Sequence, residues 1–136
     1  MKEQPENKII TSETLPEIAK RWVYRLGLSE WAIGILVVRD GEMPEVQCNG
    51  YTKTYTVQRV ARIYLLDEKD HYRDSLPVDM EIALVHELLH VKWSNIGWQD
   101  GEHVMSILEH QLLHDIAKAL VGAYRDGLCE GMDTES

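Results

Sequence analysis

The stretch "IALVHELLHVKW", residues 82–93, places two histidines and a glutamate within a run of apolar residues. On an α-helix, residues four apart lie on one face, so His86 and His90 can bind the same metal ion. Neutral imidazole is a good zinc ligand. Glu87 is rotated from His86 by about 100° around the helix, so it would flank the metal rather than bind it. The pattern H-E-x-x-H therefore predicts a zinc hydrolase helix whose general base is Glu87.

The alternative interpretation is an ordinary helix with two unliganded histidines. The apolar residues of the helix argue against it, because they form one stripe and His86 falls beside that stripe. The predicted stripe consists of Ile82, Val85, Leu89 and Trp93. The histidines are therefore expected to face the interior, where a polar group without a partner is costly. A bound metal ion would satisfy both.

A catalytic zinc ion has three protein ligands and one open position, so a third ligand is sought downstream. The stretch "SILEHQLLHDIAKALV", residues 106–121, predicts an amphipathic helix with Glu109 near the centre of its apolar face. The predicted buried stripe consists of Met105, Leu108, Leu112, Leu113, Ile116, Ala119 and Leu120. A glutamate in that position is seldom tolerated unless it is paired or metal-bound. Glu109 is therefore the predicted third ligand.

Two alternatives to Glu109 remain open. His110 lies at the margin of the same stripe, and it would give a site of three histidines. His114, one turn further on, could then orient a ligand through its ring N–H. In the second alternative the helix rolls, and Glu109 reaches a cation such as Arg21 instead of a metal.

The remaining chain predicts one helix and three strands ahead of these two helices. The expected ranges are a helix over 14–27, strands within 31–38, 45–57 and 58–66, a loop over 67–77, and helices over 77–94 and 101–124. Thr14 and Glu17 read as a capping box at the first helix. We therefore expect an α+β fold, in which a small twisted sheet of three strands packs on helices. Residues 1–10 and 127–136 are expected to be flexible tails.

Two further segments could assist catalysis. His71 and Tyr72 lie in the loop before the metal helix, and either could bind an oxyanion, although an ordinary loop histidine is the simpler interpretation. The stretch "ARIYLL", residues 61–66, could hold an extended substrate by strand addition.

Length and charge narrow the class of protein. The chain has 136 residues, near the usual domain size, and is expected to form one domain over 1–136. Its formal net charge of -9 disfavours nucleic acid as a partner, because phosphate contacts need a basic surface. No apolar run approaches the roughly 18 residues of a membrane span, and no signal core follows the N-terminus. We expect a cytoplasmic protein, and the oligomeric state stays open.

The stretch "ALVHELLHVKW" followed by "EHQLLHDIAKALV" resembles the small metallopeptidases of bacteriophages and prophages, which are similar to minimal gluzincins. The resemblance covers residues 60–122 and is loose over the first 45. It implies a zincin-like core, zinc bound by His86 and His90, Glu87 as general base and a glutamate near position 109 as third ligand. It also implies a peptide or protein substrate, encountered in the host cytoplasm if the chain is phage-encoded. Members often carry two acidic residues at "EH"; here the second is His110, which leaves the third ligand open.

A competing function is a non-catalytic module of the same fold. In that case the metal only joins the two helices, and the surface binds a protein partner. Loss of cleavage on changing Glu87 to glutamine would separate the two functions.

Overall fold

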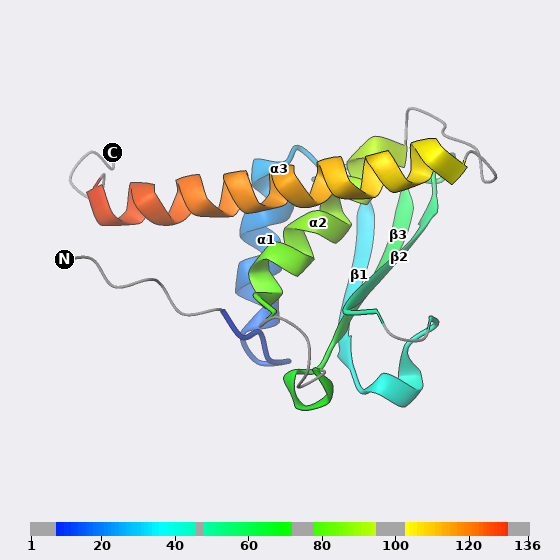
Figure 1. The fold of residues 1–136 in the computed structure, drawn as a ribbon, viewed down its shortest axis with the longest axis horizontal. Helices are drawn as coiled ribbons and strands as arrows, with labels where there is room; N and C mark the ends of the chain where they lie inside the picture. The colour runs from blue at the N-terminus through cyan, green and yellow to red at the C-terminus, as the bar shows by residue number, and fades with distance from the viewer. Residues whose placement is uncertain (1–7, 46–47, 72–77, 95–102, 131–136) are drawn as a thin grey trace.

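The computed structural model describes residues 8–45, 48–71, 78–94 and 103–130. Within these ranges the elements are α1 (Leu15–Arg25), β1 (Ala32–Val38), β2 (Gly50–Tyr55), β3 (Val60–Leu66), α2 (Met80–Trp93) and α3 (His103–Glu130). Two short 3-10 helices, Asp40–Glu42 and Glu68–Asp70, lie in the connections. The fold is α+β, with a small three-stranded sheet and three helices, as the sequence predicts (Figure 1).

The sheet has the strand order β1-β3-β2 and is mixed. β3 runs parallel to β1 and antiparallel to β2, so that Ile63 is paired with both Ile35 and Thr52. Ala61, Ile63 and Leu65 of β3 are buried and alternate with less buried residues, as expected of a strand with one face in the core. The prediction that this strand holds a substrate by strand addition is wrong, because both of its edges are already paired. Within the described part of the chain, β1 and β2 are the edge strands.

Helix α2 forms the centre of the core. It lies between the sheet and α3 (Figure 1) and also contacts α1. The predicted single stripe on this helix is too narrow, since buried residues occur around most of its circumference. The side chains that are completely buried are Leu84, Val85, Leu88 and Val91. A helix that is apolar on all sides belongs inside a core, and this placement carries His86 and Glu87 inward with it.

Helix α3 packs along a different line from the predicted one. Its buried residues are Leu113, Ala117 and Val121, whereas Leu108 and Leu112 are 52% and 45% exposed. The predicted stripe is therefore wrong in its centre. His110 precedes Leu113 by one turn on the packed line, so it turns toward α2.

Three details of the chain ends differ from the predictions. Thr14 makes no side-chain cap to α1; its hydroxyl accepts a hydrogen bond from the N–H of Thr11 instead. Residues 8–10 were expected in a flexible tail, but Ile10 is buried, and the carbonyl at position 8 accepts a hydrogen bond from the N–H of Met80. Helix α3 continues through Gly127, where we expected order to end.

A buried group of polar residues joins the three helices at the start of α2. We call Asp79, Glu81, Arg125 and Trp22 the N-terminal polar cluster. The Arg125 guanidinium donates to both oxygens of Asp79 (2.8 and 3.0 Å) and to Glu81 Oε1 (3.0 Å). The Trp22 indole N–H donates to the other oxygen of Glu81, at 2.6 Å. Every charge in this cluster has a partner, so it fixes the position of α2.

No helix in the described ranges combines the length and the apolar character that crossing a membrane requires.

Candidate metal centre

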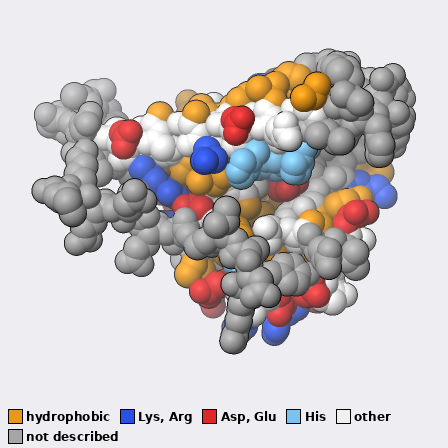
Figure 2. Space-filling model, viewed as in Figure 1, with side chains coloured by type: hydrophobic (Ala, Val, Ile, Leu, Met, Phe, Trp, Pro, Cys, Tyr) orange, Lys and Arg blue, Asp and Glu red, His pale blue; other side chains and the backbone are white. Residues whose placement is uncertain are grey.

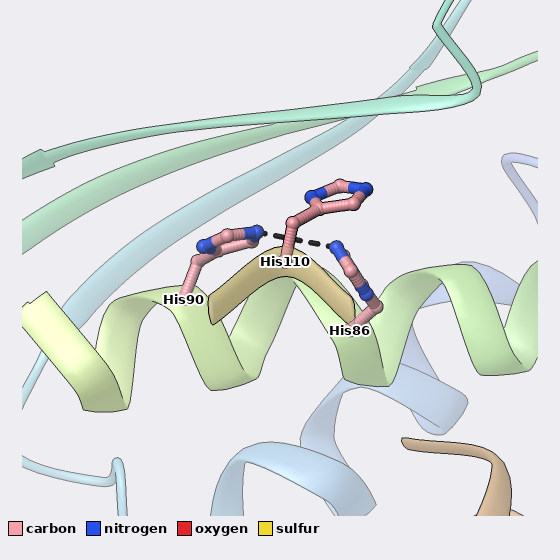
Figure 3. A group of neighbouring side chains, drawn as sticks. All are labelled: His86, His90 and His110. Atoms are coloured by element: carbon pink, nitrogen blue, oxygen red, sulfur yellow. Dashed lines mark hydrogen bonds between the residues drawn. The ribbon is translucent and has the colours of Figure 1, made fainter. Parts of the chain in front are cut away.

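Three histidines from two helices converge on one point. His86 and His90 lie on α2, and His110 reaches them from α3 (Figure 3). Each offers one ring nitrogen, and these nitrogens lie within 4.8 Å of one another. The Nε2 atoms of His86 and His90 are 3.1 Å apart, close to the roughly 3.3 Å between two nitrogens on one tetrahedral zinc ion. We call these three residues the histidine cluster; they lie close enough to hold a metal ion.

The rings of the histidine cluster are neutral. Burial, reinforced by the neighbouring imidazoles, lowers the pKa of His86 to about 3. Burial together with His110 lowers the pKa of His90 to about 4, and burial also lowers the pKa of His110. Neutral imidazoles present lone pairs, as metal ligands must. Among the described residues, the buried Nδ1 atom of His86 has no hydrogen-bond partner. This donor set fits a divalent cation such as zinc.

Glu87 stands beside the cluster with its carboxylate turned toward β2. Its side chain is buried, and the Thr52 hydroxyl donates to Glu87 Oε1 at 2.5 Å. Burial raises the pKa of Glu87 to about 7, while the Thr52 hydrogen bond opposes that shift. A group with a pKa near neutrality can both accept and return a proton. Thr52 was missed in the sequence, where it reads only as a strand residue.

Gly50 leaves room for this carboxylate. A Cβ atom built at position 50 would lie 2.7 Å from Glu87 Oε2, closer than any ordinary contact. Gly50 opens β2, so the edge strand passes directly against the glutamate. Sequence analysis could not identify this role, because the contact depends on how β2 lies against α2.

A cleft of about 570 Å³ opens beside the cluster. It lies between β2, α2 and α3, and its lining includes Glu45, Cys48, Thr52, Thr54, Thr56, Glu87, His90, Trp93, Glu109 and His110. Thr52 and Thr54 occupy alternate positions of β2, so they share the face of the strand that is turned to the cleft. Figure 2 shows histidine side chains gathered at the surface below α3. Because His90 and His110 line the cleft, solvent can reach the cluster from it.

Glu109, the predicted third ligand, lies outside the group of three nitrogens. Its Oε2 atom is 3.7 Å from His90 Nδ1, the ring nitrogen opposite the one that faces His86. The alternative with His110 in the third position fits this geometry better. Among the described residues, Glu109 lies against the neutral ring of His90 and forms no ion pair with Arg21.

The other candidates are not part of the converging group. The ring of His114 is exposed and its centroid is 5.8 Å from that of His86, but His114 is not one of the three residues whose nitrogens converge. His71 bonds through Nε2 to the carbonyl oxygen of Leu66 at 3.1 Å and does not line the cleft. Tyr72 lies outside the described residues.

No protein-family model, curated protein or solved structure matches this chain. The resemblance to phage metallopeptidases therefore stays a prediction, and the functional argument rests on the geometry of the cluster.

Proposed function

We propose that this protein is a zinc-dependent peptidase with a zincin-like core, in which His86, His90 and His110 bind the metal and Glu87 is the general base. One observation carries the proposal: a buried carboxylate with a pKa of about 7 lies beside three converging neutral histidines at an open cleft. Three histidines with an open position form a donor set of catalytic zinc sites. The packing of the H-E-x-x-H helix on a mixed sheet supports the zincin-like core.

Glu87 moves the proton in the proposed reaction. A zinc ion bound to the cluster would act as a Lewis acid toward the scissile carbonyl and the attacking water. Glu87 accepts a proton from the water as the water oxygen bonds to the carbonyl carbon. It then gives that proton to the amide nitrogen as the C–N bond breaks, leaving a carboxylic acid and an amine. Thr52 holds Oε1 and Oε2 lies next to Gly50, so the transfer would use Oε2.

The substrate would lie along β2. This strand is an edge of the sheet within the described residues, and it lines the cleft next to Glu87. An extended peptide can pair with such an edge through main-chain hydrogen bonds. A peptide bound there would run past the histidine cluster, so this geometry supports peptide as the substrate class.

The cleft also favours catalysis over a purely structural metal. Structural zinc sites are closed by four protein ligands. Among the described residues the cluster offers three nitrogens, and His110 is open to solvent. A structural site would have no use for the buried acid at position 87.

The test is to digest a peptide library with the zinc-loaded wild type and with Glu87→Gln. We expect the variant to bind zinc and to fold as the wild type does. Its cleavage rate should fall by about 100-fold or more, the usual contribution of a general base. Glu45→Gln, which changes an exposed carboxylate of the same cleft, is the matched control and should still cleave. If folded, zinc-loaded wild type cuts no peptide, the non-catalytic module is the better account.

A further inference from the structure

The position of Glu109 points to a role that differs from metal ligation. Glu109 and His110 are neighbours on α3, but they contact different parts of the site. His110 contributes one of the three converging nitrogens, while the Glu109 carboxylate lies 3.7 Å from His90 Nδ1. A small side-chain rotation would bring the two atoms to hydrogen-bond distance, about 2.7–3.2 Å.

The two nitrogens of the His90 ring therefore face different groups. Nε2 faces His86 Nε2 at 3.1 Å, inside the cluster. A metal ligand must present a lone pair, so the proton of the neutral ring belongs on Nδ1. The atom nearest to such a proton should be an acceptor, and the Glu109 carboxylate is one. Its side chain is only 18% exposed, so water screens this contact weakly.

His86 provides an internal comparison. It offers Nε2 to the same point, but its Nδ1 has no hydrogen-bond partner among the described residues. The two histidines on α2 are therefore unequal: within the described part of the chain, a carboxylate that can fix the tautomer lies next to His90 but not next to His86. The packing of α3 on α2 places the Glu109 carboxylate and the His110 nitrogen at the site together.

We propose that Glu109 is a positioning residue that accepts the Nδ1–H of His90, and so strengthens metal binding without contacting the metal. The inference rests on the proposed metal site but not on peptidase activity. It explains why a carboxylate occupies the flank of α3 next to a ligand.

Zinc affinity and the ligand set together test this role. Affinities would be measured by chelator competition for the wild type, Glu109→Gln and Glu109→Ala, with X-ray absorption spectra of each zinc-loaded protein. We expect Glu109→Ala to bind zinc about 10- to 100-fold more weakly. Glu109→Gln should fall between the two, because its amide oxygen still accepts a hydrogen bond. All three spectra should contain the same three-imidazole signature.

The matched control is Asp115→Asn, which removes an exposed carboxylate from the same helix. It should leave the zinc affinity within about twofold of the wild type, since the effect depends on contact with His90 rather than on net charge. Urea unfolding of the metal-free proteins would separate a loss of affinity from a loss of stability.

Three results would overturn the inference. Equal zinc affinity in Glu109→Ala and the wild type would remove the positioning role. A wild-type spectrum with two imidazoles and a carboxylate, altered by Glu109→Ala, would make Glu109 a ligand. A wild type that binds no zinc would remove the site itself. A zinc-loaded wild type that cuts no peptide would contradict the proposed function alone and leave this inference intact.

Discussion

Helix α2 carries two buried polar groups of opposite character. In the N-terminal polar cluster, each carboxylate oxygen of Asp79 and Glu81 has a donor from Arg125 or Trp22. In the histidine cluster, nitrogens face nitrogens, and His86 Nδ1 has no partner among the described residues. The first cluster therefore holds the helices together through its own pairs, whereas the three histidines of the second lie close enough to hold a metal ion.

The largest effect is expected from breaking the paired cluster. In Arg125→Met, Asp79 and Glu81 lose their cation while their side chains stay 6% and 4% exposed. Removing one partner of a buried ion pair costs about 3–5 kcal/mol, and we expect the free energy of unfolding to fall by that amount. Urea unfolding of the metal-free protein measures it. Arg21→Met, an exposed change on α1, is the control and should stay within about 0.5 kcal/mol. A loss below about 1 kcal/mol would mean that the paired cluster does not secure α2.

Acid should weaken the protein through the histidine cluster. The folded pKa values of His86 and His90 are about 3 and about 4, below the unfolded value of about 6.5. As the pH falls below about 6.5, these two histidines bind protons in the unfolded chain but not in the folded chain, so the free energy of unfolding falls. Between pH 7.5 and pH 4.5, the free energy of unfolding of the metal-free wild type should fall on the order of 3 kcal/mol further than that of the double variant His86→Gln/His90→Gln. Urea unfolding across this range gives the comparison, and parallel pH profiles would contradict it.

A methyl group at position 50 should impair catalysis without removing the metal. In Gly50→Ala the new Cβ displaces the Glu87 carboxylate, which it would otherwise approach to 2.7 Å. If Glu87 is the proposed general base, misplacing it should lower the cleavage rate about 10- to 100-fold, with zinc affinity unchanged. Gly34→Ala is the control, because a Cβ on that strand of the same sheet meets nothing within 4 Å. Equal cleavage rates of Gly50→Ala and Gly34→Ala would mean that the position of Glu87 does not affect the reaction.

The smallest effect, and one of opposite sign, is expected from His86→Leu. It removes the Nδ1 atom that lacks a partner among the described residues. Replacing such a group by an apolar one should leave the free energy of unfolding of the metal-free protein unchanged or raise it by about 1 kcal/mol. Zinc should no longer stabilise the variant. A clear fall in the free energy of unfolding of metal-free His86→Leu would mean that the histidine cluster stabilises the fold, as the N-terminal polar cluster does.

Local patterns predict the elements, and tertiary packing decides the site. The alternation in β3 and the spacing of His86 and His90 follow from the geometry of a strand and a helix, so both could be read from the sequence. The roll of α3 could not, because Leu108 and Leu112 are as apolar as Leu113 but remain exposed. That roll places His110, and not Glu109, in the group of three converging nitrogens.

The contacts of Glu87 depend on packing in the same way. Thr52 and Gly50 reach it because β2, the second strand in the chain, forms the edge next to α2. The pairing of Arg125 with Asp79 joins residues far apart in the chain, so no local sequence pattern predicts it.

Zinc titration of the metal-free wild type and His110→Ala tests the central claim most directly, namely that the histidine cluster is a metal centre. Calorimetry should find one zinc ion per wild-type chain and an affinity at least 100-fold weaker in His110→Ala, which removes one of three ligands. His114→Ala, one turn away on the same exposed face, should bind as the wild type does. Absence of zinc binding in the wild type, or equal binding in His110→Ala, would contradict the claim.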